Sequence, residues 1–336
     1  MKAGFRIISS KEESAWNALV AEASVHDMYH TCLYHCLQEE GESRLLVFEN
    51  NEGKFMALPL IFRNIPRTEW KDVTSVYGYA GWIRSDVNAS FPDAMKQLED
   101  YLQQEKVVSA FSRLHPLIPG SDDFGRGKVL TLNTTTGIDL SLAPEKQFAA
   151  YSESVRRSIR KSTQAGMTVE WVREDAGLQH FISIYEKAMK RHQASSNYFF
   201  SQRYYEKLWK NESFQTFILA AKLHGEWAGA ALFTICNGIM QYHLGGVTAS
   251  CIAYSPLKLI LDEARKIAND KRCNFFHLGG GLGGRDDNLF VFKSRMTTLR
   301  YPFKVWQWII KEEEYEWLSR NKKDSDFFPR YRISGE

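Results

Sequence analysis

The residues best suited to binding a charged group lie late in the sequence, in a glycine-rich run and a lysine that follows it. The run covers residues 279–284 and includes Gly280 and Gly281. Glycine allows positive φ and close approach of the backbone to a ligand, so such a loop can cradle a phosphate, although a P-loop ending is missing. Lys293, directly after Phe292, offers a compact charge suited to a phosphate, a carboxylate or a developing oxyanion. The alternatives are a turn between two elements and an ordinary surface lysine.

Four cations within residues 154–161 form a second candidate site. Helical spacing places Arg156 beside Arg160 and Arg157 beside Lys161, because residues four apart share one side of a helix. Guanidinium groups bind phosphate through paired hydrogen bonds, so this face could hold a phosphorylated or nucleotide-bearing substrate. A solvated helix face whose cations pair with nearby acids explains the pattern equally well.

Histidine and cysteine side chains gather between residues 26 and 36 and raise the question of a zinc site. His26 and His30 are four residues apart, and so are Cys32 and Cys36. No structural-zinc signature accompanies them, so we expect no metal site. The Gly-x-Ser-x-Gly motif is also missing from the sequence, which gives no support to Ser-His-Asp catalysis.

Length and composition limit the class of protein. The 336 residues suggest about two domains, and 44% hydrophobic with 25% charged residues exclude a disordered or fibrous chain. A net charge of +3 argues against a protein that coats duplex DNA. The five cysteines match no disulfide framework, and no stretch reaches the roughly 20 apolar residues of a membrane span. We therefore expect a soluble, cytoplasmic protein.

The predicted helices and strands follow a similar order twice along the chain. In the first half we expect helices at 12–23, 31–40 and 91–104 and strands at 44–49, 54–62 and 107–114. In the second half we expect helices at 151–164, 177–191, 204–210 and 255–269 and strands at 167–172, 216–222, 227–236, 239–245, 274–278 and 301–310. Asn237-Gly238 is a strong hairpin signal, and Ser255-Pro256 opens an amphipathic helix.

These elements and motifs resemble the FemAB-like and BioF2-like acyltransferases of the GNAT superfamily. The basic run 154–167 is similar to the helix between the two halves of those transferases. Residues 275–280 and 289–293 are similar to the family's strand, glycine-rich loop and late Phe-Lys pair. In the first half, residues 58–60 and 74–81 look like segments of Fem-like proteins.

The resemblance, over roughly residues 30–305, implies an α/β (α+β) fold of two tandem GNAT-like domains with mixed, mostly antiparallel sheets. We expect the domains at 1–150 and 151–336, with the basic helix 151–165 at their junction. The implied reaction moves an acyl or aminoacyl group from acyl-CoA or aminoacyl-tRNA to an amine, which in the best-known members belongs to a cell-wall precursor peptide. Members that use tRNA often carry a long helical hairpin, for which residues 190–201 leave little room, so both donors stay open.

The resemblance also implies where donor and acceptor bind. In a GNAT-type fold the strand ending at Gly245 and Gly246 splays from its neighbour and holds the acyl carbonyl through backbone N–H groups, and consecutive glycines fit a bulge there. The helix that opens at Ser255 would receive the donor phosphates. Tyr77 and Tyr79 could form aromatic walls for a small or muropeptide-like amine. We expect no tightly bound cofactor, with acyl-CoA or aminoacyl-tRNA acting as co-substrate.

An attacking amine must lose a proton, so a base is needed directly or through water. His243, Asp286 and Asp287 are the candidates, while Lys293 and backbone N–H groups would stabilise the oxyanion. We expect neither a covalent enzyme intermediate nor a metal. The alternative is a degenerate GNAT pair that binds RNA, a sugar-peptide or a nucleotide ligand without catalysis, and such a protein needs no acyl donor.

Overall fold

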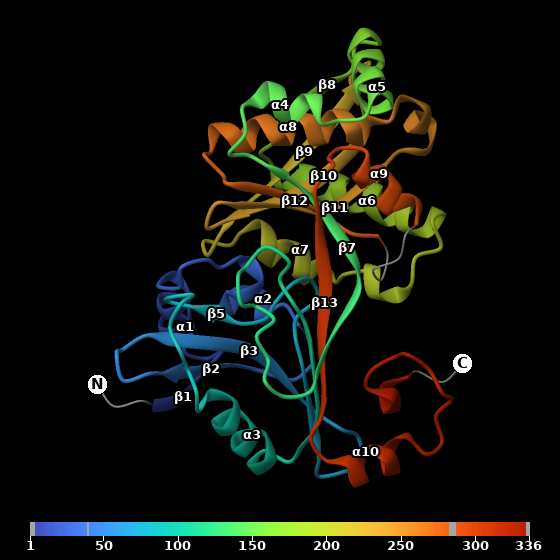
Figure 1. Cartoon of the computed structure of the whole chain (residues 1–336). Helices are drawn as coiled ribbons and strands as arrows, with labels where there is room; N and C mark the ends of the chain where they lie inside the picture. Colours follow the sequence, from blue (N-terminus) through green and yellow to red (C-terminus); the bar gives the residue numbers. More distant parts are fainter. Residues whose placement is uncertain (1–3, 39, 282–286, 334–336) are drawn as a thin grey trace. The chain divides into compact units, whose positions relative to one another are not determined.

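A computed structural model of the protein describes residues 4–38, 40–281 and 287–333. The chain divides into two compact units. Unit 1 comprises Met1–Leu132 together with Pro302–Glu336, and unit 2 comprises Asn133–Tyr301. Each unit contains its own strands (Figure 1). Each unit also has its own buried core.

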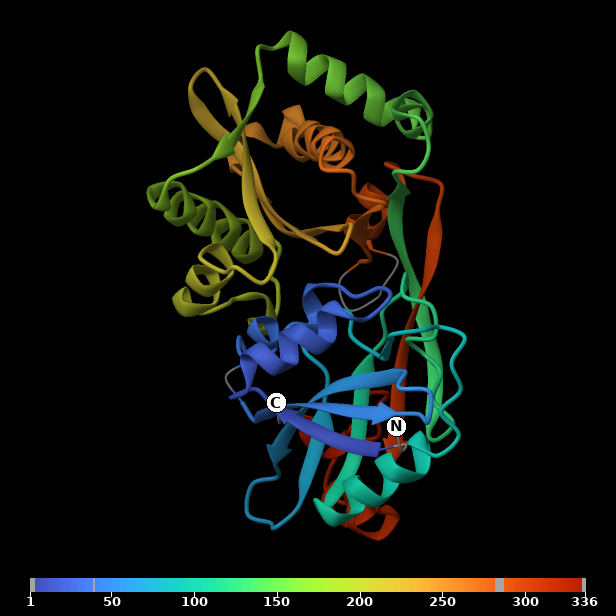
Figure 2. The same cartoon turned by 90° about the vertical axis from the view of Figure 1, so that its left-hand side faces the viewer.

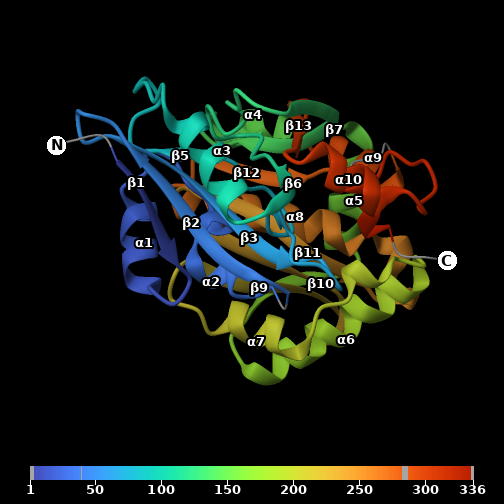
Figure 3. The same cartoon turned by 90° about the horizontal axis from the view of Figure 1, so that it is seen from below.

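Unit 1 is built on a mostly antiparallel sheet. Its elements are β1 (Gly4–Ser9), α1 (Glu13–Ala21), α2 (Cys32–His35), β2 (Glu42–Glu49), β3 (Phe55–Asn64), β4 (Lys71–Thr74), β5 (Ile83–Arg84), α3 (Ala94–Gln104), β6 (Val107–Arg113), β13 (Arg300–Ile309) and α10 (Glu312–Ser319). The strand order is β1-β2-β3-β4-β6-β13, in which only β4 and β6 run parallel. Figure 3 shows β1, β2 and β3 side by side. Trp82 and Trp306 are fully buried in a core that α3 helps to form.

Unit 2 repeats this strand pattern. Its elements are β7 (Lys128–Asp139), α4 (Pro144–Ala149), α5 (Glu153–Gln164), β8 (Thr168–Val172), α6 (Asp175–Arg191), α7 (Gln202–Trp209), β9 (Gln215–Leu223), β10 (Glu226–Cys236), β11 (Ile239–Val247), α8 (Pro256–Asp270), β12 (Phe275–Gly279) and α9 (Asn288–Ser294). The order is β8-β9-β10-β11-β12-β7, and only β11 and β12 run parallel. The predicted mixed α/β class with two similar halves is therefore confirmed.

Each unit receives one strand from the other half of the sequence. β13 pairs with β6 in unit 1, where Val305 lies opposite Arg113. β7 pairs with β12 in unit 2, where Ile138 lies opposite Phe276. The bounds of the compact units consequently differ from the expected division at 150/151. Residues 133–150 belong to unit 2, and residues 302–336 belong to unit 1.

Local sequence explains several features of unit 2. Asn237 and Gly238 join β10 to β11 with φ values of 44° and 75°, as a two-residue turn with two positive φ angles requires. Gly166 follows α5 with a φ of 81°, which suits a helix C-terminus. Figure 2 shows α6 and α8 on opposite sides of the sheet, with α5 against α8. In the described part of the chain, no helix is long and apolar enough to cross a bilayer.

Candidate functional site

The central feature of unit 2 is a parallel strand pair whose ladder is short. Residues 239–241 of β11 pair with residues 275–277 of β12. β11 continues to Val247, but the ladder recorded in the described residues ends at Gln241. The second half of β11 therefore has an edge that β12 does not pair with, which is the arrangement expected of a strand whose backbone holds an acyl carbonyl.

An irregularity in β11 lies at His243. The register between β10 and β11 shifts between Leu232 and Phe233, which makes His243 the extra residue of a β-bulge. The sequence suggested that Gly245 and Gly246 fit such a bulge, and this is wrong, because both glycines pair regularly with β10. The bulge instead redirects the side chain of the histidine.

The two glycines are needed for packing. A Cβ on Gly245 would lie 2.4 Å from the Tyr242 hydroxyl oxygen, which is closer than two unbonded atoms can approach. A Cβ on Gly246 would lie 3.0 Å from the Ile184 carbonyl oxygen of α6. Their small size thus lets a tyrosine ring and a helix lie directly on β11.

His243 is held by a neighbouring tyrosine. Its Nε2 lies 2.7 Å from the hydroxyl of Tyr204, a buried residue of α7, and the two rings are stacked. Burial lowers the pKa of His243 to about 4. The imidazole is therefore neutral at physiological pH.

This lowered pKa predicts how His243 responds to acid. The folded chain resists protonation of the imidazole, whereas the unfolded chain takes up the proton near the ordinary pKa of 6.5. Between pH 6.5 and about 4 the unfolded state thus binds more protons, and the contribution of His243 to stability falls as the pH is lowered. We expect its ring resonance, identified by its loss in His243→Gln, to stay constant from pH 8 to 5.5. A titration midpoint near 6.5 would contradict the half-buried, neutral imidazole.

Lys293 is a buried lysine of α9. Its side chain is 8% exposed, and Nζ donates a hydrogen bond of 2.8 Å to the Gly280 carbonyl oxygen. The same ammonium lies 5.5 Å from the centre of the Tyr242 ring on β11. Burial lowers the pKa of Lys293 to about 8, although the charge of Asp287 acts in the opposite direction. The interpretation as an ordinary surface lysine is therefore wrong.

Of the two predicted aspartates, Asp286 and Asp287, the structure describes only Asp287. Asp287 is the N-cap of α9, where its Oδ1 accepts a hydrogen bond of 2.8 Å from the Phe290 backbone N–H. Asp286 lies outside the described residues, as do residues 282–285 of the glycine-rich run. The Asp287 carboxylate thus has a structural task that competes with a role as base.

The beginning of the glycine-rich run is held against β7. Gly280 accepts the Lys293 hydrogen bond, and a Cβ on Gly280 would lie 3.2 Å from the Thr134 carbonyl oxygen. Gly281 is half-buried, and so is Phe292, which packs against the core of unit 2. The structure therefore brings the glycines, the Phe-Lys pair and Tyr242 together.

The start of α8 gathers positive charge. Ser255 precedes the helix in a left-handed conformation with a φ of 53°, and Pro256 opens the first turn. Lys258 in that turn donates a hydrogen bond of 2.9 Å to the Ser158 hydroxyl of α5. Burial, followed by the nearby charge of Arg295, lowers the pKa of Lys258. The positive end of the helix dipole and two cations thus favour an anion at this end of the helix.

The four predicted cations of α5 have two different environments. Arg156 donates hydrogen bonds to the carbonyl oxygens of Ala149 and Tyr151, at 2.8 and 2.6 Å, so it holds the turn before the helix. Arg157, Arg160 and Lys161 are exposed, and none of them has an ion pair recorded in the described residues. The alternative of a face paired with acids therefore finds no support at these three positions.

The predicted aromatic residues lie in unit 1. The Tyr79 ring packs edge-on against Tyr29, His115 and Phe303. The Tyr77 carbonyl oxygen accepts a hydrogen bond of 2.9 Å from the Tyr34 hydroxyl. Both residues are half-buried, so they are part of a packed aromatic cluster and still reach the surface.

Sequence reasoning missed a buried polar chain beside the end of the parallel ladder. The His277 ring contacts Gln241 Oε1 through Nδ1 at 2.8 Å and the Thr135 hydroxyl through Nε2 at 2.9 Å. His277 is fully buried, and Gln241 and Thr135 are nearly so. The signal in the sequence was His277 itself, a polar residue within the apolar run 275–278. The resemblance included this run but implied no role for the histidine. Within the described ranges no three His, Cys, Asp or Glu side chains gather as a metal site requires.

Comparison with known proteins found one matching family model and several structures with a similar fold. Residues 149–288 match the family model described as an acetyltransferase (GNAT) domain. The crystal structure of FemX has a TM-score of 0.71 and 13% identity, covering 94% of this chain and 99% of FemX. The structure of L-PGS from Bacillus licheniformis has a TM-score of 0.58 and 12% identity, covering 89% of this chain and 92% of that one. No curated protein matches the sequence. At these identities the two structures show a shared fold.

Proposed function

We propose, from the match of residues 149–288 to the model of an acetyltransferase (GNAT) domain, that the protein transfers an acyl or aminoacyl group from an activated donor to an amine. The observation that carries the proposal is the short ladder between β11 and β12. It leaves backbone groups of β11 unpaired by β12, close to the buried ammonium of Lys293 and to the start of α8.

In the proposed reaction the amine attacks the donor carbonyl directly. The carbonyl oxygen becomes an oxyanion, which backbone N–H groups of β11 and the Lys293 ammonium would stabilise. Collapse of this intermediate forms the amide and releases the CoA thiolate or the tRNA hydroxyl. His243, neutral above about pH 4, is the proposed acceptor of the amine proton, directly or through water. Asp287 is less suited because it caps α9.

The donor carries phosphates in either form that we propose, acyl-CoA or aminoacyl-tRNA. The start of α8 and the exposed cations of α5 supply positive charge for these groups. Residues 192–201 between α6 and α7 contain one 3-10 turn, at Ser196–Tyr198, in place of a long helical hairpin. The acceptor class that we propose is an amine of a cell-envelope precursor, and the five free cysteines agree with a cytoplasmic location.

A double variant tests the proposed donor site. Arg157→Ala/Lys161→Ala removes two exposed cations from α5, and we expect it to weaken acetyl-CoA binding roughly 10-fold at low salt and to flatten its salt dependence. Lys187→Ala/Lys190→Ala removes the same charge from α6 and serves as the control. Aminoacyl-tRNA, with many more phosphates, should show a much steeper salt slope if it is the donor. Equal affinity of both double variants and wild type at every salt concentration would contradict the site.

A further inference from the structure

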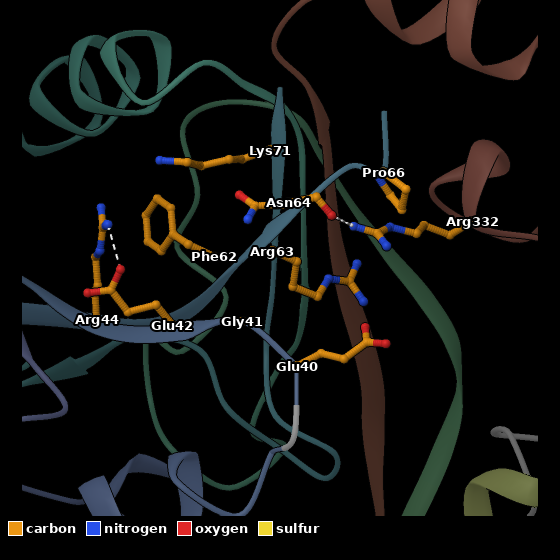
Figure 4. Close-up of a pocket in the computed structure, with 10 residues that line it drawn as sticks. All are labelled: Glu40, Gly41, Glu42, Arg44, Phe62, Arg63, Asn64, Pro66, Lys71 and Arg332. Carbon is orange, nitrogen blue, oxygen red and sulfur yellow. Dashed lines mark hydrogen bonds and ion pairs between the residues drawn. The ribbon is translucent and has the colours of Figure 1, made fainter. Parts of the chain in front are cut away.

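Unit 1 contains a charged cavity that plays no part in the transfer site of unit 2. The cavity has a volume of about 390 Å³, near the lower end of the range for small-ligand pockets. Its walls come from the start of β2, the end of β3, the start of β4 and the residue Arg332 (Figure 4). Residues far apart in the sequence thus meet around one space.

A buried carboxylate holds two arginines in this wall. Asp72 is 1% exposed, and its two oxygens accept hydrogen bonds from Arg63 Nε at 2.8 Å and from Arg332 Nε at 2.7 Å. Both guanidinium groups are therefore fixed through Nε. Arg332 also donates from one terminal nitrogen to the Asn64 carbonyl oxygen, whereas neither terminal nitrogen of Arg63 has a partner recorded in the described residues. The outer edge of Arg63 is thus oriented and available to an oxyanion.

The remaining cations of the cavity are neutralised by their neighbours. Arg44 pairs with Glu42 at 2.8 Å and with Glu105 at 2.9 Å. Lys71 pairs with the same Glu105 at 2.7 Å. The single carboxylate of Asp72, in contrast, is shared by two guanidinium groups. The net positive charge of the wall therefore lies on Arg63 and Arg332.

A negative group lies on the same rim. Glu40 lines the cavity and is exposed, and no ion pair is recorded for it in the described part of the chain. Figure 4 shows the Glu40 and Arg63 side chains extending toward the same part of the cavity. A ligand that complements both must carry charges of both signs, and a polyanion would meet the Glu40 carboxylate.

We propose that this cavity binds a small zwitterion, whose carboxylate or phosphate contacts Arg63 and Arg332 and whose amine contacts Glu40. Phe62 packs in the core of unit 1 beneath the Arg44 guanidinium, on the opposite face of β3 from Arg63, so the charged side chains supply the contacts of the ligand. The site lies in unit 1 and does not depend on the transferase activity proposed for unit 2.

Titration of the full chain with four probes, followed by NMR, tests the site. Glycine and phosphoethanolamine carry both charges, and acetate and ethanolamine carry one each. We expect saturable binding of the two zwitterions, with the tighter one showing whether a carboxylate or a phosphate is preferred, and at least 10-fold weaker binding of acetate and ethanolamine. Arg63→Gln should weaken both zwitterions at least 10-fold, and Glu40→Gln should weaken them while leaving acetate unaffected.

Arg67→Gln is the matched control, because this exposed arginine lies outside the cavity wall. Glu40→Gln changes an exposed residue with no recorded ion pair, so its fold should persist even if Arg63→Gln proves unstable. The proposal is overturned if neither zwitterion saturates, or if Arg67→Gln weakens binding as much as Glu40→Gln does. Acyl-transfer activity does not enter this test, so its result stands apart from that of the proposed function.

Discussion

Lys293→Met is expected to lower the turnover of acyl transfer roughly 10²–10³-fold, the effect of losing one oxyanion-stabilising donor. Methionine keeps most of the apolar stem and removes the charge and the hydrogen bond to the Gly280 carbonyl. If the ammonium binds only a donor phosphate, the donor KM rises and turnover is largely kept. Lys187→Met, on the exposed face of α6, is the control. Wild-type values of both kinetic parameters in Lys293→Met would refute the role.

The pH dependence of turnover is a second test of the role of Lys293. Since burial lowers its pKa to about 8, turnover that needs the ammonium should fall as the pH rises through 8. A rise in turnover through the same pH would assign the neutral amine as the base instead. The unfolded chain binds the proton up to about 10.5, so the contribution of Lys293 to stability increases between pH 8 and 10.5. At pH 7 the methionine variant should therefore melt no lower than wild type.

Asp72→Asn is expected to destabilise the fold by about 3 kcal/mol, because it leaves two arginines without their shared buried carboxylate. The affected residues join β3, β4 and the end of the chain, so the loss should appear in the unfolding of unit 1. Asp100→Asn is the control, since that aspartate pairs with Lys96 on the exposed surface of α3 and should matter little. Urea denaturation compares the two variants, and equal midpoints would show that the buried bridge contributes nothing.

The sequence was sufficient to predict most helices and strands. It was not sufficient to predict that β7 and β13 each pair with strands from the other half of the sequence. Asn237-Gly238 and the apolar runs beside it predicted the β10–β11 hairpin, because turn type and strand pattern are local properties. β7 was missed because Asn133 and Gly137, two residue types that are rare in strands, interrupt its β-branched residues. Its pairing with β12, and that of β13 with β6, connects distant residues, which no local pattern specifies.

The sequence predicted which residues belong to the candidate site better than it predicted their burial and contacts. The glycine-rich run and Lys293 were identified by order and residue type, whereas the burial of Lys293 depends on the contact of α9 with Tyr242. His243 was named as an inward-facing histidine, but the bulge and the Tyr204 contact are tertiary properties. The chemistry of glycine and lysine can be recognised from the sequence. The desolvation and the pKa of a side chain are set only by packing in the folded protein.

The proposed activity of the protein is the formation of an amide from an activated acyl donor and an amine. The most direct measurement is mass spectrometry of a panel of amines, including a muropeptide, incubated with wild type or Lys293→Met and with isotope-labelled acetyl-CoA or aminoacyl-tRNA. We expect wild type to produce an acceptor whose mass increases by the labelled acyl group, and Lys293→Met to produce far less. Tight binding of the donor without a labelled product for any amine would contradict the claim and would favour a non-catalytic binding protein.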